Sequence, residues 1–206
     1  MNVKLITITP DAEATMAYIA RVSSPNQENP EYAKLLTYCL EHQHWSVFEH
    51  AYMTIEITTS RMISAQILRH RSFTFSEFSQ RYSEPMDYVP VKARRQAEKN
   101  RQSSVDDAPV HVRSWWETIQ QDVFADAQRA YEDAISYGVA RECARAILPM
   151  NTQTRLYVTG SVRSWIHYIQ LRTKADTQLE HREVAEGCKA IFVEQLPSVA
   201  AALGWA

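Results

Sequence analysis

Glycine is scarce and scattered in this chain of 206 residues, and this limits how the chain can bind a nucleotide. Its four glycines are Gly138, Gly160, Gly187 and Gly204, and no two of them are close in sequence. A dinucleotide-binding G-x-G-x-x-G turn and a phosphate-binding G-x-x-x-x-G-K loop are therefore both absent. We expect any nucleotide-like ligand to be held by side chains and helix ends instead.

The order of apolar and polar residues predicts an α+β fold with few strands. Alternating or β-branched residues predict strands at 3–9, 51–58 and 154–159. Helical patterns predict helices at 12–22, 31–42, 61–70, 112–137, 140–148, 161–172 and 177–196. We expect a few-stranded mixed or antiparallel sheet packed with long helices, in a single domain spanning residues 1–206.

Local signals refine this outline. Asp11 is expected to be the N-cap of the first helix, and Gly138 is expected to end the helix at 112–137. Residues 83–110 contain three prolines and the charged run 92–101. They are predicted to form a loop-rich excursion with a short exposed helix.

Composition narrows the functional classes. The 22 basic and 24 acidic residues leave a net charge of -2, which disfavours nucleic-acid binding as the main function. Cys39, Cys143 and Cys188 fit neither a zinc site nor a disulfide framework, so a reducing, cytoplasmic setting is expected. No signal peptide and no apolar run long enough to span a membrane are recognisable, so we expect no membrane partner.

The residues that most suggest chemistry lie at 66–82. Three basic residues in a row at 69–71 fall where a helix is expected to end, and arginine side chains there could bind phosphate in a bidentate manner. Glu77, Ser79 and Arg81 then add a carboxylate, a hydroxyl and a guanidinium, which together suit a sugar phosphate. From physical chemistry alone, a solvated basic helix end followed by a loop is an equally good interpretation.

Several motifs, in order and at matching spacing, resemble those of flavin-dependent thymidylate synthases of the ThyX type. Arg69-His70-Arg71, followed by seven residues and Ser79, matches the RHR-x7-S signature of that family. Further similar segments lie at 20–23, 44–50, 145–149 and 163–172. The resemblance covers residues from about 20 to about 186.

The resemblance implies an activity and its participants. Reductive methylation of dUMP to dTMP would take its carbon from 5,10-methylenetetrahydrofolate and its hydride from reduced FAD, which NADPH would recharge. The family's active sites lie where the subunits of a homotetramer meet. The conventional thymidylate synthase attacks with a cysteine, commonly after a proline, whereas no cysteine here follows a proline.

The resemblance also implies which residues bind the cofactor. They are Ser23, Ser46, Glu49, Arg69, His70, Arg71, Glu77, Ser161, Arg163 and His167. The family often has asparagine where this chain has Ser161 and His167, and often threonine at Ser46. Arg163 and Arg172 are expected on opposite faces of one helix, so that one face could serve the flavin and the other the nucleotide.

The implied nucleotide site consists of Gln66, Arg69, Glu77, Phe78, Ser79, Gln80, Arg81, Arg145 and Arg172. Arg172, Arg81 and Ser79 form its catalytic group. Arg172 matches the arginine that stabilises negative charge on the pyrimidine. Ser79 is expected to bind rather than attack, because no histidine close in sequence could activate it. Gln80 replaces a residue that is often glycine.

Other functions remain open. His42, His44, Glu49 and His50 could suggest a metal site, but their spacing fits no H-E-x-x-H helix, and no metal is expected. The alternatives are a metal-dependent nucleotide phosphohydrolase, a non-enzymatic nucleic-acid-binding helical domain and a family member that binds without turnover. The basic run at 92–101 is read as a solvated loop that could also lie near the folate tail.

Overall fold

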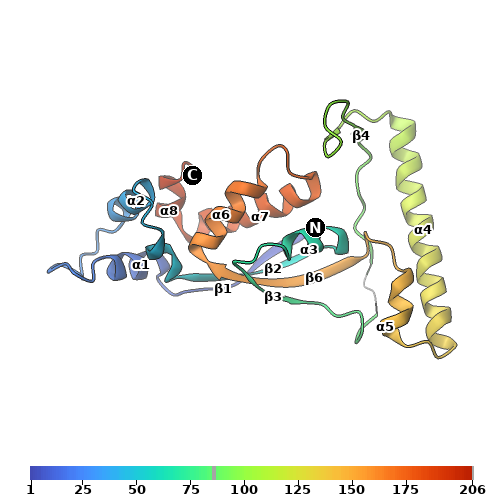
Figure 1. The fold of residues 1–206 in the computed structure, drawn as a ribbon, viewed down its shortest axis with the longest axis horizontal. Helices are drawn as coiled ribbons and strands as arrows, with labels where there is room; N and C mark the ends of the chain where they lie inside the picture. The colour runs from blue at the N-terminus through green and yellow to red at the C-terminus, as the bar shows by residue number, and fades with distance from the viewer. Residues whose placement is uncertain (85–86, 206) are drawn as a thin grey trace. The chain divides into compact units, whose positions relative to one another are not determined.

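The computed structural model describes residues 1–84 and 87–205, and the chain divides into two compact units (Figure 1). The first unit comprises Met1–Ile57, Leu68–Ser76 and Leu156–Ala206, and the second comprises Thr58–Ile67 and Glu77–Arg155. Pro85, one of the prolines that suggested the excursion, lies outside the described residues. The single domain stays a prediction.

A four-stranded sheet confirms the α+β class. Its order is β1-β2-β6-β3, with the strands β1 (Asn2–Ile8), β2 (Tyr52–Ser60), β3 (Thr74–Glu77) and β6 (Gln153–Ser161). Along β2, Met53, Ile55 and Ile57 are fully buried and alternate with half-buried residues, as the period of two in a strand requires. The sequence analysis missed β3, which has four residues and little apolar alternation.

The helices of the first unit follow the predicted order. They are α1 (Ala12–Ala20), α2 (Ala33–Glu41), the 3-10 helix η1 (Trp45–Glu49), α6 (Val162–Arg172), α7 (Leu179–Gln195) and α8 (Pro197–Ala202). The short η1 and α8 were not predicted. Asp11 is the N-cap of α1, which confirms the prediction, although its φ is 45° and its side chain makes no capping hydrogen bond.

Two glycines of the first unit allow close packing. A Cβ at Gly187 on α7 would lie 2.5 Å from Val3 of β1, and a Cβ at Gly160 on β6 would lie 2.3 Å from the Phe73 ring. Neither distance is compatible with a side chain. Close approach of backbone to a neighbouring side chain therefore explains glycine at both positions.

The second unit contains the longest helix. Its helices are α3 (Arg61–Ile67), α4 (Val110–Ser136), α5 (Arg141–Ala144) and the 3-10 helix η2 (Arg145–Ile147). Gly138 follows α4 with a φ of 84°, which confirms it as the residue that ends this helix. Among the described residues, no helix is long and apolar enough to cross a membrane.

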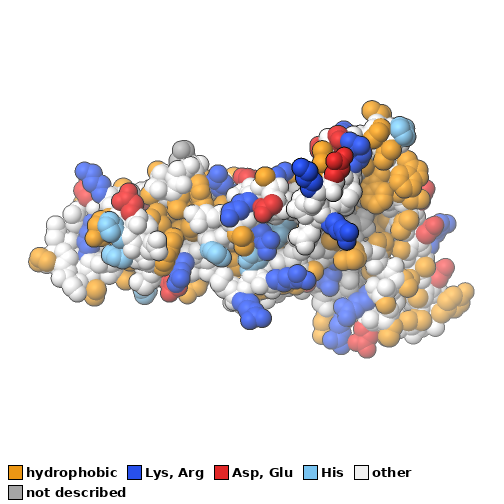
Figure 2. All heavy atoms as spheres, turned by 45° about the horizontal axis from the view of Figure 1, so that its top comes forward, with side chains coloured by type: hydrophobic (Ala, Val, Ile, Leu, Met, Phe, Trp, Pro, Cys, Tyr) orange, Lys and Arg blue, Asp and Glu red, His pale blue; other side chains and the backbone are white. Residues whose placement is uncertain are grey.

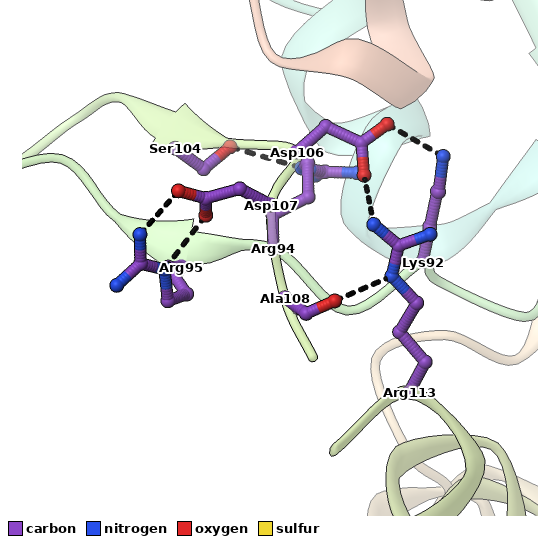
Figure 3. A network of polar contacts seen from close by, with 8 residues as sticks. All are labelled: Lys92, Arg94, Arg95, Ser104, Asp106, Asp107, Ala108 and Arg113. Atoms are coloured by element: carbon purple, nitrogen blue, oxygen red, sulfur yellow. Dashed lines mark hydrogen bonds and ion pairs between the residues drawn. The ribbon is translucent and has the colours of Figure 1, made fainter. Parts of the chain in front are cut away.

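The described part of residues 83–109 is loop-rich, as predicted, but it contains no short exposed helix. The charged run 92–101 within it is not helical. It contributes β4 (Arg95–Gln96), which pairs antiparallel with β5 (Ser104–Val105). Figure 3 shows the reason: cationic side chains reach across to a pair of aspartates. Lys92 and Arg113 contact Asp106, and Arg95 contacts Asp107. Contacts distant in sequence therefore outweigh local helix propensity here.

Candidate functional site

The predicted site residues fall into two groups, one in each unit. The first unit holds Ser23, Ser46, Glu49, Arg69, His70, Arg71, Ser161, Arg163, His167 and Arg172, and the second holds Gln66, Glu77, Phe78, Ser79, Gln80, Arg81 and Arg145. The first group therefore contains all the predicted cofactor residues except Glu77. The second contains most of the predicted nucleotide residues.

A cleft of about 500 Å³ lies beside α6 in the first unit. Its lining comprises Trp45, Glu49, Ser72, Arg163, Ser164, Ile166, His167 and Gln170. Three of these residues, Glu49, Arg163 and His167, belong to the predicted cofactor site. Arg163 and His167 share the exposed side of α6, as their spacing of four residues requires. Trp45 and Gln170 were not predicted as site residues. Trp45 is next to Ser46, and Gln170 lies one helical turn after His167.

An ion pair orients Arg163 in this cleft. Arg163 Nη1 lies 2.5 Å from Glu49 Oε1, and it connects α6 to η1. Both side chains are about half exposed, so the pair contributes little to stability. Its structural effect is to place a guanidinium and a carboxylate together in a cleft whose size suits a small ligand.

Ser161 caps α6 rather than facing solvent. Its Oγ accepts a hydrogen bond from the Ser164 backbone N–H at 3.2 Å, and only 7% of the residue is exposed. Ser164 Oγ in turn donates to the backbone oxygen of Ser72 at 3.2 Å. A serine at this position is therefore explained by helix capping. A flavin contact from Ser161 stays a prediction.

Arg172, at the C-terminal end of α6, is held by His70. Arg172 Nε donates to His70 Nε2 at 2.9 Å, across 102 residues of sequence. Arginine can only donate, so His70 Nε2 must be unprotonated. Burial, and then electrostatic interactions with Arg172 and His167, lower the pKa of His70 to about 4. Near pH 7 His70 is thus a neutral hydrogen-bond acceptor for Arg172. Arg163, on the same helix, pairs with Glu49 instead.

The remaining basic residues of the signature lie on the surface. Arg69 and Arg71 are exposed on either side of half-buried His70. Ser23 and Ser46 are exposed as well. Three residues in a row therefore have two roles: the outer two present charge to solvent, and the middle one faces the protein interior.

Glu77, in the second unit, is the most constrained of the predicted residues. Its Oε1 accepts hydrogen bonds from Ser64 Oγ at 2.6 Å and from Thr154 Oγ1 at 3.0 Å. Arg61 Nη1 lies 3.0 Å from the same oxygen. These three contacts join β3 to α3 and β6 and fix the carboxylate where the RHR-x7-S segment ends.

Arg81 approaches a carboxylate that the sequence analysis did not single out. Arg81 Nη2 lies 2.9 Å from Glu142 Oε2, and Arg145 Nε donates to the Glu142 backbone oxygen at 3.3 Å. Ser79 Oγ accepts from the Arg81 backbone N–H at 3.3 Å, which shapes the turn. Arg81 and Arg145 thus both contact Glu142, Arg81 at the carboxylate and Arg145 at the backbone oxygen.

Gln80 is buried in the same turn, at 6% exposure. Its Nε2 has no hydrogen-bond partner among the described residues. The Phe78 backbone N–H donates to the Arg155 backbone oxygen at 2.8 Å, which ties this segment to β6. Gln66 on α3 is half buried.

The cysteines and acidic residues suggest no other chemistry. Cys39 and Cys188 are buried, and burial raises the pKa of both thiols. Cys143 is exposed. Within residues 1–84 and 87–205, no three His, Cys, Asp or Glu side chains are grouped so as to hold a metal ion. Figure 2 shows Lys and Arg interspersed with Asp and Glu on one face, in keeping with the small net charge.

Comparison with known proteins gives a consistent result. Residues 4–198 match the family described as "Thymidylate synthase complementing protein". A flavin-dependent thymidylate synthase of Synechocystis is 55% identical over 193 residues, which cover 94% of this chain and 90% of the relative. A probable flavin-dependent thymidylate synthase of Paramecium bursaria Chlorella virus 1 is 50% identical, with 100% of both chains covered.

Solved structures agree with the sequence relatives. PolB of Streptomyces cacaoi, a UMP/dUMP methylase bound with 5-Br dUMP, superposes with a TM-score of 0.86 and 26% identity, covering 98% of this chain and 94% of that one. The complex of the same enzyme with 5-Br UMP gives the same TM-score. On this sequence and structural similarity, the chain belongs to the flavin-dependent thymidylate synthase family.

Proposed function

We propose that this protein converts dUMP to dTMP by flavin-dependent reductive methylation. The observation that carries the proposal is the 55% and 50% identity, over nearly the whole chain, to relatives named as flavin-dependent thymidylate synthases. The chain also has the RHR-x7-S signature. 5,10-Methylenetetrahydrofolate is the proposed carbon donor, FAD the flavin and NADPH the source of reducing equivalents. Among the described residues, no group of His, Cys, Asp or Glu side chains is placed to hold the metal that a phosphohydrolase of this kind would need.

The cleft beside α6 fits part of a flavin dinucleotide. Its lining combines the Trp45 ring, the Arg163 guanidinium and the His167 imidazole, which suit an aromatic ring and a diphosphate. Its volume of about 500 Å³ lies within the range of ligand sites. Arg69, His70 and Arg71, with Ser23, Ser46, Glu49 and Ser161, complete the proposed cofactor residues. When bound, the reduced flavin supplies the hydride that completes the methyl group.

The turn at residues 79–81 suits the phosphate of the nucleotide. Arg81 contacts the Glu142 carboxylate, Arg145 contacts the Glu142 backbone oxygen, and Ser79 adds a hydroxyl next to Arg81. A phosphate arriving there would replace Glu142 as the partner of Arg81, because a dianion attracts a guanidinium more strongly than a single carboxylate does. Gln66, Phe78 and Gln80 are the further nucleotide residues proposed, and Glu77 would accept a hydrogen bond from the sugar.

Arg172 is the proposed catalytic cation. Its Nε is engaged by His70, so its Nη groups can donate to a pyrimidine oxygen. Such donors stabilise negative charge that develops on the ring as carbon 5 becomes nucleophilic. No cysteine is needed for this activation, which is consistent with the burial of Cys39 and Cys188.

The proposal is tested with the purified protein. We expect a visible flavin band near ~450 nm that bleaches with dithionite and shifts when dUMP is added. Tritium release from [5-³H]dUMP should then require methylenetetrahydrofolate and NADPH together. A colourless protein that takes up no added FAD, or one that releases no tritium when loaded with FAD, would refute the proposal.

A second candidate substrate follows from the solved neighbours. Because PolB is described as a UMP/dUMP methylase, [5-³H]UMP should be assayed beside [5-³H]dUMP. The two sequence relatives at 50% identity or above are named thymidylate synthases, so dUMP is the substrate we expect to be preferred. Equal kcat/KM values for both nucleotides would replace thymidylate synthesis by a broader methylase activity.

A further inference from the structure

The ring of His70 is enclosed by three aromatic side chains. Its centroid lies 5.0 Å from that of Tyr168, 6.3 Å from that of His181 and 6.4 Å from that of Phe73. The corresponding interplanar angles of 83°, 85° and 67° make all three contacts edge-to-face or nearly so. Such contacts limit the rotation of the half-buried His70 ring.

Two of these neighbours are buried polar groups that no part of the proposed reaction uses. Tyr168 on α6 is 1% exposed and His181 on α7 is 0% exposed. Tyr168 Oη and His181 Nε2 form a hydrogen bond of 3.2 Å. Burial lowers the pKa of His181 to about 3 and raises that of Tyr168, so both side chains are uncharged near pH 7. Apolar residues could fill this space without the cost of burying polar groups.

The enclosure has a direct consequence for Arg172. Because arginine Nε must donate, His70 can hold it only when Nε2 is unprotonated and points at the guanidinium. A ring flip of His70 would present the other edge of the imidazole, and protonation would add a second cation beside Arg172. Both changes would release the guanidinium from its present direction.

We propose that His181 and Tyr168 are positioning residues that act through His70 to aim Arg172 at its substrate. The chain of contacts runs from α7, through α6, to the turn that carries the RHR signature, and back to the end of α6. This inference rests on the proposed nucleotide role of Arg172. It assigns to His181 and Tyr168 a function that core packing alone does not require.

The test uses graded substitutions at Tyr168 and His181. Tyr168→Phe deletes the hydroxyl and keeps the ring against His70, while His181→Leu removes the imidazole and His181→Gln keeps a polar side chain. Phe192→Leu is the matched control, because Phe192 is also fully buried on α7 but packs against Trp205. The FAD-loaded proteins are compared by kcat and KM for dUMP between pH 5 and pH 9.

We expect Tyr168→Phe and His181→Leu to lower kcat/KM about tenfold, mainly through kcat, because the guanidinium is misplaced. The acid limb of the pH profile should move toward higher pH, as water reaches His70. His181→Gln should recover part of the activity, and Phe192→Leu should leave the profile unchanged. Unchanged profiles in Tyr168→Phe and His181→Leu would overturn the proposal.

A second measurement is independent of turnover. In protein labelled with ¹⁵N-histidine, the wild-type His70 should show a single neutral tautomer with the proton on Nδ1, whereas Tyr168→Phe and His181→Leu should show a second form. One unaltered tautomer in both variants would reduce His181 and Tyr168 to packing. If the wild type synthesises no dTMP, the proposed function fails, while the tautomer result still decides whether His70 is positioned.

Discussion

Arg81 illustrates, at the scale of single residues, how partners decide what a side chain can do. The family resemblance implies a nucleotide-binding role for Arg81, but its partner Glu142 belongs to no motif. Both side chains are more than half exposed, so the ion pair adds little to stability and can be exchanged readily. Arg81 is therefore available for a ligand phosphate.

Replacement of Arg81 tests this availability. Arg81→Ala should raise KM for dUMP by roughly ten- to a hundredfold, because a hydrogen bond to a charged group is worth about 1.5–3 kcal/mol. Its unfolding free energy should change by less than about 1 kcal/mol. Arg129→Ala is the control, since Arg129 on α4 is exposed and pairs with Asp126. Equal KM values in the two variants would remove Arg81 from the site.

The buried imidazole of His181 makes a prediction about pH. Its pKa is lowered to about 3 when folded, against about 6.5 when unfolded, so it favours folding fully above pH 6.5. This contribution is lost as the pH falls from 6.5 toward 3, at about 1.4 kcal/mol per pH unit. The unfolding free energies of wild type and His181→Gln should be measured with urea at pH 7, 6 and 5. The loss of unfolding free energy per pH unit should be smaller by this amount in the variant. The same pH dependence in both proteins would mean that the pKa of His181 is the same in the folded and the unfolded protein.

At the scale of elements, the placement of α6 depends on its N-cap. Ser161 accepts the Ser164 N–H, and α6 then carries Arg163, Tyr168 and Arg172 to their partners. A stable first turn fixes the start of a helix, and therefore the direction in which its later side chains point. The cap is therefore relevant to both the cleft and the His70 contact.

Substitution of Ser161 separates capping from ligand binding. Ser161→Ala should lower the unfolding free energy by about 1 kcal/mol, whereas Ser161→Asn should retain most of it, because asparagine is an equally good N-cap. FAD affinity measured by absorbance titration should follow the same order if Ser161 acts only through α6. A Ser161→Ala protein with unchanged stability would contradict the capping role.

The contact between α7 and β1 requires glycine. Gly187→Ala should destabilise the protein by about 1–3 kcal/mol, because its Cβ would lie 2.5 Å from Val3. Removing the obstacle in the double variant Val3→Ala/Gly187→Ala should recover part of that loss. Thermal unfolding of both single variants and the double variant gives the interaction free energy between positions 3 and 187. Strictly additive losses would show that another contact explains the glycine.

At the scale of the whole molecule, the family resemblance implies a homotetramer whose active sites lie between subunits. Exposed apolar side chains on α4, among them Val110, Trp115 and Val123, are available for subunit contacts. Light scattering should give four times 23.7 kDa, or about 95 kDa. A monomeric mass together with full activity would contradict the shared site.

Sequence alone was sufficient for the properties that depend on local order. The period of the apolar residues predicted β1, β2, α4 and the α+β class, and Gly138 marked the end of α4 because few other residues adopt its backbone conformation. The RHR-x7-S motif indicated the family because the spacing of reactive groups along the chain is itself the signal.

Tertiary structure decided which distant groups meet. No local pattern pairs Arg81 with Glu142, or encloses His70 between Tyr168 and His181. The charged run at 92–101 contributes the strand β4, whose neighbouring cations are held by Asp106 and Asp107. Such contacts arise when packed elements bring together residues far apart in sequence, and their energies depend on distance and burial, which a linear pattern does not contain.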